Sequence, residues 1–513
     1  MPTKSFGGKI KNFIKDNYKF LIFCALFFFL NCCFLIVAAY KNSVSLLSEG
    51  AILTIGAAIV IHIVLCVFVF YAKKKNWSIQ KIFLVVGSVL GIMYLLAIPM
   101  GRVPDECTHF WKVYSVSQGN FLTETKDDTT GNYVPKNLIT FANEFRKGGY
   151  GQLAEKITEQ PDEEQMFLKN IGSSPIDYAP HIVGMMTGRV LHLPILISLY
   201  LARLFGLITC IAIIYFCIKY IPILKKTLFF FACLPMTMQL LIGIDYDGII
   251  LCSAMAIVTL VLHFIYNPTA KLKKSHYILA ALFCLLLTNV KPVYFPLCAL
   301  LFFIPTACFK SKKQKIFSII AILLITVGAF LLWSAFSVVM EAQGEANSSE
   351  QIHFILSNPV RYSGILVQNI FNMPDVYITR LSHLEWLDVS TDKFYQIGTL
   401  IFFVILCVEA RLNPAKQISK KLRIATLAII IASTILVFTA MYIQHTAVGQ
   451  DIIEGVQTRY LFPLLITVPI ICIPTASAAI NAPRKLLIPD LYFYAFIIFL
   501  NINALGAIVF AHI

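Results

Sequence analysis

Two adjacent carboxylates, Asp105 and Glu106, follow a long apolar run and precede His109 by four and three residues. A carboxylate is expensive in hydrocarbon, so an acidic pair here indicates a site at the rim of a membrane. In a helix that begins at Pro104, such spacing lets the three side chains converge. Carboxylates can take a proton from a hydroxyl or hold a divalent cation. The plainer alternatives are a helix cap for the acids and an ordinary surface histidine.

Other ionisable residues lie within or at the ends of apolar runs. Asp245 and Asp247 follow one run, Lys291 lies between two, and Arg459 opens another. Charges at such positions are functional candidates. Lys291 and Arg459 also suit headgroup anchoring, and Asp247 suits a helix N-cap. Arg203, inside an apolar run, is better explained as a structural residue that snorkels or forms a salt bridge.

The elements that position these residues are membrane-spanning helices. The chain has 513 residues, of which 58% are hydrophobic and 13% charged, whereas a soluble protein is about one quarter charged. About thirteen apolar runs are candidate spans, which predicts an all-α polytopic membrane protein with external juxtamembrane helices. These runs are 19–40, 51–72, 81–100, 195–218, 227–244, 248–266, 276–290, 293–309, 316–340, 395–409, 424–443, 460–478 and 488–511.

The net charge is +15, and the distribution of the basic residues along the chain indicates how it is oriented in the membrane. Basic residues gather in short connections between alternate runs, as the positive-inside rule requires of cytoplasmic loops. The pattern predicts a cytoplasmic N-terminus, an external C-terminus and an external position for Asp105, Asp245, Asp247, Lys291 and Arg459. It argues for contact with the bilayer and its anionic lipids and against a nucleic-acid partner.

The chain divides into an N-terminal pair of spans (1–80), a core (81–480) and a final span (481–513). The core carries two long external loops, 101–194 and 341–394, and loops of such length usually carry function.

Each long loop has a predicted helical part. In the first loop a helix is expected from Pro104 to Gln118, ended by Gly119. In the second, apolar spacing predicts an amphipathic helix that is broken near Pro359 and lies along the headgroup layer. Ordinary loop polarity explains the charged residues that follow it, which are Asp375, Arg380, His383 and Glu385.

Five groups of segments, in order, resemble the DUF2142 family of predicted bacterial membrane proteins, within the GT-C superfamily of glycosyltransferases. The resemblance covers most of the chain, and Thr458 stands where glycine is expected. The segments are Pro104-Asp105-Glu106 with His109-Phe110 and Gly119, Tyr178-Ala179-Pro180 with Leu201-Ala202-Arg203-Leu204, Leu234-Pro235-Met236 with Asp247-Gly248, Lys291-Pro292-Val293-Tyr294, and Gly455-Val456-Gln457-Thr458-Arg459-Tyr460 with Pro463.

The resemblance implies a GT-C-like helix bundle that transfers a hexose or pentose from a polyprenyl-phosphate donor. The acceptor would be a cell-surface glycan, polymer, lipid or protein, on the extracytoplasmic side of a bacterial cytoplasmic membrane. Transfer would invert the anomeric carbon, with no covalent sugar–enzyme intermediate.

The resemblance and the chemistry of transfer together imply residue roles. Asp105 would be the base, Glu106 its partner, and His109 would position Asp105 or the acceptor. If Mg²⁺ or Mn²⁺ takes part, Asp105 and Glu106 would bind it. Lys291 and Arg459 would bind the donor phosphate. The other cavity candidates are Asp245, Asp247, Tyr294, Gln457 and Tyr460.

Two other classes of function remain open from the sequence. A transporter or flippase of a lipid-linked saccharide would line a path through the membrane midplane with its charges. A non-catalytic scaffold in cell-envelope polymer assembly would not need the charged residues to meet. Convergence of Asp105, Lys291 and Arg459 within about 10 Å around one outward cavity would favour catalysis.

Overall fold

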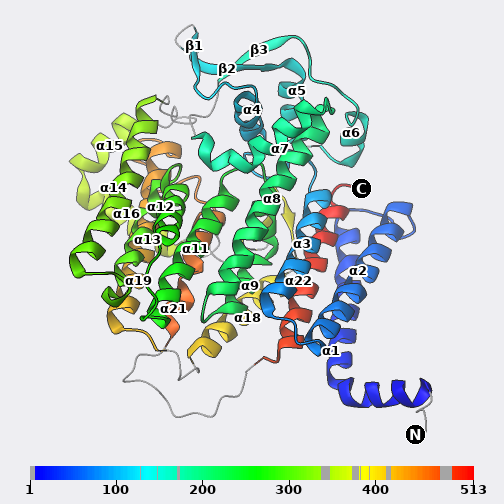
Figure 1. The fold of residues 1–513 in the computed structure, drawn as a ribbon. Coiled ribbons are helices and arrows are strands. Elements are labelled where there is room, and N and C mark those ends of the chain that lie inside the picture. The colour runs from blue at the N-terminus through cyan, green and yellow to red at the C-terminus, as the bar shows by residue number, and fades with distance from the viewer. Residues whose placement is uncertain are drawn as a thin grey trace.

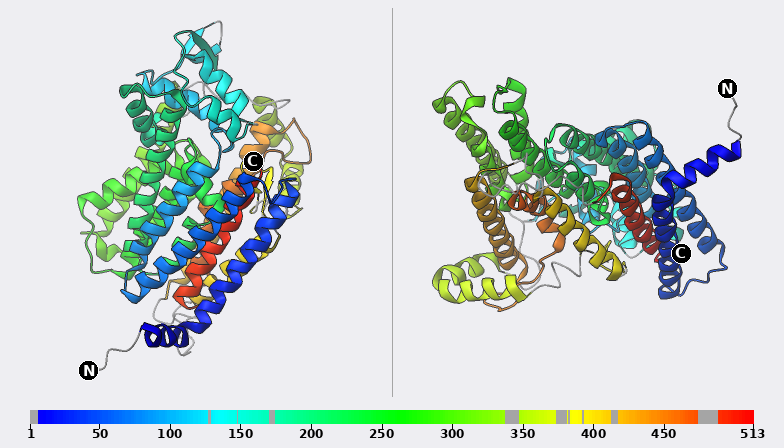
Figure 2. Two further views of the ribbon diagram at one scale, coloured as in Figure 1. Left: turned by 90° about the vertical axis from the view of Figure 1, so that its right-hand side faces the viewer. Right: turned by 90° about the horizontal axis from the view of Figure 1, so that it is seen from below.

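The chain forms a helix bundle with a small mixed region at one end (Figure 1). The computed structural model describes residues 6–126, 129–146, 148–169, 174–336, 347–372, 381, 383–391, 393–411, 417–473 and 488–513. The described chain begins, at residue 6, at the end of the bundle opposite the mixed region (Figures 1 and 2). The predicted all-α polytopic class is confirmed.

Eight helices in these described ranges are long and apolar enough to cross a membrane. Each matches one of the apolar runs identified in the sequence, in the same order. They are α1 (Phe6–Lys41), α2 (Glu49–Lys74), α3 (Ile79–Ala97), α8 (Ile195–Tyr220), α11 (Asp247–Tyr266), α14 (Lys312–Phe336), α19 (Lys420–His445) and α22 (Asp490–Phe510).

The other five apolar runs are not among these eight helices, so the described residues contain fewer such helices than the roughly thirteen expected. The run at 227–244 is a pair, α9 (Lys225–Ala232) and α10 (Pro235–Ile242), bent by 66°. The helices α12 (Lys274–Thr288) and α18 (Lys393–Arg411) fall outside the eight. The runs at 293–309 and 460–478 are divided into short helical turns, and 474–478 lies outside the described residues.

Proline explains most of these interruptions. It removes a backbone donor and clashes with the preceding turn, so it begins helical segments and rarely continues them. It opens α10 at Pro235 and the turn η2 (Pro292–Tyr294), and it lies in the first turn of α13 (Phe295–Cys298), α20 (Phe462–Leu465) and α21 (Val468–Cys472).

The first long loop folds into a region of its own, here called the first-loop region (residues 101–194). Its helix α4 (Glu106–Ser117) begins two residues later than expected. A three-stranded antiparallel sheet in the order β1-β2-β3 lies beyond it, with Tyr133 of the middle strand opposite Phe167. The remaining elements are β1 (Glu124–Lys126), β2 (Thr129–Pro135), α5 (Lys136–Phe145), α6 (Tyr150–Glu155), β3 (Gln165–Lys169), η1 (Pro175–Tyr178) and α7 (Ala179–Val190).

The second long loop contains the expected broken amphipathic helix. Helix α15 (Ser348–Ser357) ends before Pro359, and α16 (Pro359–Asn372) begins at this proline, which confirms the predicted break. A short hairpin follows, of β4 (His383–Leu384) and β5 (Val389–Ser390). Asp375 and Arg380, which were grouped with this loop, lie outside the described residues.

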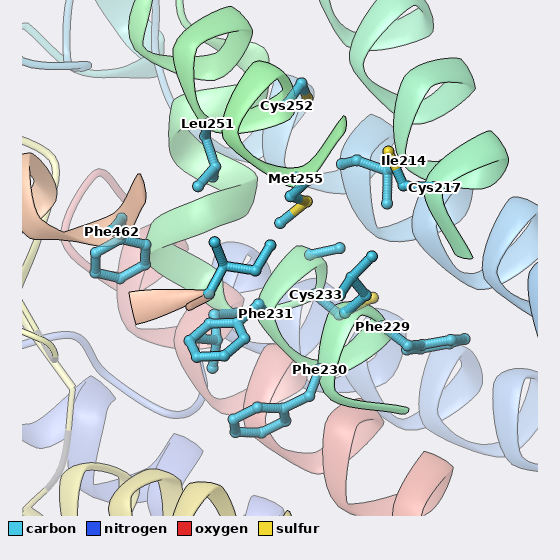
Figure 3. Close-up of a cluster of buried hydrophobic side chains, with 14 of the residues drawn as sticks. Ile214, Cys217, Phe229, Phe230, Phe231, Cys233, Leu251, Cys252, Met255 and Phe462 are labelled. Carbon is cyan, nitrogen blue, oxygen red and sulfur yellow. The ribbon is translucent and has the colours of Figure 1, made fainter. Parts of the chain in front are cut away.

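The apolar core runs through the centre of the bundle. Phe229, Phe230 and Phe231 of α9 are buried there with Met255 of α11 and Phe462 of α20 (Figure 3). The last helix, α22, packs against α1, α2, α3 and α10 (Figure 2). This final span is almost entirely buried, so the N-terminal pair of spans and the core both pack against it.

Candidate functional site

The turn that carries Asp105 connects α3 to α4 and has an unusual backbone. Gly101 has φ +84° and Asp105 has φ +66°, both in the left-handed region that L side chains rarely adopt. Asp105 occupies the N-cap position of α4, yet its side chain makes no capping hydrogen bond. It forms an ion pair with Arg459 instead, and 49% of it is exposed. A capping role therefore does not account for Asp105.

Glu106, next in sequence, is completely buried in a different set of contacts. Its two oxygens accept from Nε and Nη2 of Arg203 at 2.7 and 2.6 Å. They also accept from the backbone N–H groups of Gly101 and Ile244, at 2.8 and 3.0 Å. Because both oxygens are engaged, the expected roles of Glu106 as partner in proton transfer and as metal ligand do not fit. Its contacts are structural, as expected for Arg203.

Four charged side chains meet beside this turn. Arg459, at the start of η6 (Thr458–Leu461), binds Asp105 and has its Nε 3.8 Å from an oxygen of Asp247. Asp247, at the start of α11, forms an ion pair with Lys291, which follows α12. The side chains of Arg459, Asp247 and Lys291 are 6%, 11% and 18% exposed. Asp105 is therefore the most accessible charge in this group, here called the charge cluster (Asp105, Asp247, Lys291 and Arg459).

Aromatic rings surround the cations of the charge cluster. The Lys291 Nζ lies 5.0 Å from the ring centre of Tyr246 and 4.6 Å from that of Tyr460. Tyr294 donates its hydroxyl to the Tyr460 carbonyl at 2.7 Å. Tyr294 and Tyr460 thus join the site as expected. Gln457 is linked to it through the backbone, since its carbonyl accepts from the Tyr460 N–H at 3.1 Å.

His109 is buried beside the charge cluster and is not a surface residue. Its Nδ1 lies 2.6 Å from the Tyr178 hydroxyl, and its ring meets that of Tyr246 edge-on. Burial lowers the pKa of His109 to about 4, although the charges of Asp105 and Asp247 act against the shift. The imidazole is therefore neutral at pH 7, and it can orient neighbouring groups without adding a charge.

Two opposing effects set the pKa of Asp105. Burial acts to raise this pKa, while the charge and hydrogen bond of Arg459, with a smaller contribution from the charge of Lys291, lower it. The net pKa lies below the usual value of an aspartate. Asp105 is therefore ionised at neutral pH and would become more basic if Arg459 were drawn away.

Asp245 lies behind the cluster and differs from the other acids. One of its oxygens accepts from the Asp247 N–H at 2.7 Å, and the other has no hydrogen-bond partner among the described residues. Burial, followed by the charge of Asp247, raises the pKa of Asp245 to about 8. Asp245 therefore holds a proton at neutral pH.

The ligands expected for a divalent cation do not meet in one place. Within the described ranges, no group of three or more His, Cys, Asp or Glu side chains is placed to hold a metal ion. Asp105 faces the cationic Arg459, and Glu106 is occupied by Arg203. These residues do not fit the predicted metal site.

Sequence reasoning missed two polar groups that support the site. The first is Tyr178, which contacts His109 and was noticed only as part of a resembling segment. The second joins Arg102, Glu385 and His512, although the sequence alone explains Glu385 by ordinary loop polarity. Glu385 is completely buried, so that attribution is wrong. No local pattern reveals a partner 283 residues away along the chain.

Comparisons with known proteins identify a family and no characterised relative. No curated protein and no solved structure matches the chain. The family described as "Predicted membrane protein (DUF2142)" matches residues 88–468. This range includes the whole charge cluster and both long loops. The chain therefore belongs to the DUF2142 family of predicted membrane proteins.

Proposed function

We propose that this protein is an integral-membrane glycosyltransferase of the GT-C type. It would move a sugar from a polyprenyl-phosphate donor to a cell-surface acceptor, on the extracytoplasmic side of the membrane. One observation carries the proposal: a half-exposed carboxylate, Asp105, shares Arg459 with a second carboxylate at the end of a membrane-spanning bundle. This arrangement places a candidate base next to candidate phosphate ligands.

The two cations suit the phosphate of a lipid-linked donor. Lys291 and Arg459 lie at helix ends, where a headgroup can reach them while its lipid tail stays in the bilayer. A guanidinium can bind two phosphate oxygens at once. Negative charge grows on the leaving phosphate during transfer, and cations aimed at it stabilise the transition state. Before the donor binds, Asp105 and Asp247 neutralise these cations.

Binding of the donor would also prepare the base. As Arg459 turns toward the phosphate, its hold on Asp105 weakens and the pKa of Asp105 rises toward the usual value. The acceptor hydroxyl then attacks the anomeric carbon and gives its proton to Asp105. A new bond forms between the acceptor oxygen and this carbon. The bond to the phosphate oxygen breaks, and its electron pair leaves with the lipid phosphate, which inverts the anomeric centre.

A test of this proposal is Asp105→Asn, which preserves shape and removes the base. Transfer should fall by about 10²- to 10⁴-fold, the usual contribution of general base catalysis. The measurement is sugar transfer in membranes that contain equal amounts of inserted protein, with lipid-linked sugars profiled in parallel. Asp451→Asn is the matched control, because Asp451 is 68% exposed and pairs only weakly with Arg361.

Two results would contradict the proposal. Full transfer by the Asp105→Asn protein would show that Asp105 is not the base. A trapped sugar–enzyme adduct would show that transfer proceeds by double displacement. The donor that accumulates when the protein is lost would name the sugar.

The alternative of a transporter has one supporting feature, the bent pair α9–α10. A transporter of a lipid-linked saccharide would leave its cargo on the cytoplasmic side when inactivated, whereas a transferase would leave unused donor on the outer side. The side on which the donor accumulates in the Asp105→Asn strain separates the two functions.

A further inference from the structure

A second group of ionisable side chains lies on the other side of the turn that carries Asp105. It consists of Arg102, Glu385, Asp388 and His512, here called the clamp. Arg102 donates from Nε to Glu385 at 2.7 Å and pairs with Asp388. His512 Nε2 lies 2.8 and 2.9 Å from the two oxygens of Glu385. Glu385 is completely buried, so its contacts with Arg102 and His512 are shielded from water, whereas Asp388 is 50% exposed.

The backbone around the clamp is strained on both sides of the contact. Glu385 and Leu387 have φ +56° and +69°, and they face a turn that itself contains two left-handed residues, Gly101 and Asp105. Strained residues of this kind persist only where their surroundings hold them, and they gather at functional sites. Trp386 helps to hold the turn in place, because its indole nitrogen donates to the Gly101 carbonyl at 3.1 Å.

The hairpin that carries Glu385 is in turn fixed to the bundle. Gln239 of α10 accepts from the Glu385 N–H at 2.7 Å and donates to its carbonyl at 3.3 Å. Arg102 also donates to the Arg146 carbonyl in the first-loop region, at 2.9 Å. The clamp therefore connects the first-loop region, the second long loop, α10 and His512, which lies two residues after the end of α22.

The turn is thus held from two directions. On one side Glu106 is fixed by Arg203, and on the other Arg102 is fixed by Glu385, which His512 also contacts. Asp105 lies between these two attachments, within three residues of Arg102. Its left-handed backbone directs its side chain to Arg459 and not to its own helix.

We infer that Glu385, with Arg102 and His512, positions Asp105 against Arg459, and that these three are positioning residues of the site. Their consequence for transfer rests on the proposed function, but their effect on the turn does not. Loss of the Glu385 charge leaves Arg102 buried without its main partner, so the turn shifts toward water. The Asp105 carboxylate then leaves Arg459.

A cysteine in the same turn reports on its position. Cys107 is buried, and its Sγ lies 3.7 Å from the Gly101 carbonyl. Burial, with the neighbouring charge of Glu106, raises the pKa of Cys107 to about 12. Because the thiolate is the reactive form, Cys107 should react slowly with an impermeant maleimide in the intact protein.

The first experiment measures this reaction in Glu385→Gln and His512→Ala proteins. We expect labelling of Cys107 to accelerate by about tenfold or more, because each unit by which its pKa falls gives tenfold more thiolate. His263→Ala is the matched control, since His263 interacts with the Tyr220 carbonyl far from the turn. Cys107→Ser identifies the labelled site. Unchanged labelling in both folded variants would overturn the inference, and if Glu385→Gln fails to insert, His512→Ala decides.

The second experiment follows transfer against pH. Asp105 is faced by Arg459, His109, Lys291 and His445, so its low pKa depends on its position. Release of the clamp should move the acid limb of the profile of kcat/KM to higher pH. If the variants only lose folded protein, kcat/KM will fall at every pH and the acid limb will stay in place. That result would contradict the inference. Faster labelling without any transfer by the unaltered protein would reject the proposed function and keep the positional role.

Discussion

Neighbouring carboxylates have opposite roles at the residue scale. Asp105 is half-exposed and pairs with Arg459 of the charge cluster. Glu106 is completely buried and binds Arg203 of the spanning helix α8. The sequence placed both acids in one chemical group because a helix brings adjacent residues to the same rim. It could not show which of them turns inward, since that depends on the left-handed backbone of Asp105.

Glu106→Gln tests this division. The change leaves Arg203 buried without an anion, which should lower the free energy of unfolding by about 3–5 kcal/mol. The measurement is thermal unfolding in detergent, and Asp105→Asn is the comparison because its carboxylate is half in water. Equal stability of the two variants would show that Glu106 is not the structural acid.

Broken helices position the site at the element scale. The charged residues lie where α10 meets α11, after α12 and at the start of η6, and Pro292 begins a segment directly after Lys291. Apolar length predicted where the chain runs through the membrane. It did not predict interruptions, because hydropathy is insensitive to a missing backbone donor. The prolines were visible in the sequence and could have been read as breaks.

Gly101→Ala tests the turn between α3 and α4. A Cβ there would lie 2.8 Å from the Phe145 Cβ, and the φ of +84° strains any L side chain. The free energy of unfolding should fall by about 1–3 kcal/mol. Gly151→Ala in α6 is the control in the same region, because its Cβ would meet nothing within 4 Å. A neutral Gly101→Ala in the same denaturation assay would show that this turn is not strained.

The whole molecule brings the site together from distant parts of the chain. Asp105 and Arg459 are 354 residues apart, and Arg102 and Glu385 are 283 apart. Charge patterning alone predicted that the members of the charge cluster share one side of the membrane, and their convergence agrees with it. The clamp escaped prediction because burial of a loop carboxylate depends on tertiary packing, which no local pattern encodes.

Membrane orientation is the prediction at this scale. Single cysteines placed at Lys126 in β1 and at Lys75 after α2 should differ in labelling by an impermeant reagent on intact cells. The first should react directly, and the second only after permeabilisation, because basic connections stay in the cytoplasm. The reverse pattern would place the charge cluster inside and exclude an extracytoplasmic acceptor.

The central position of α22 has a consequence for biogenesis. This helix packs against α1 and α2, yet it is separated from them by almost the whole chain. At ordinary rates of translation, the ribosome reaches it on the order of tens of seconds after the first spans have emerged. Those spans must therefore remain in the bilayer without their main partner, and lateral assembly of membrane helices follows their insertion. The bundle can close only after α22 has been synthesised.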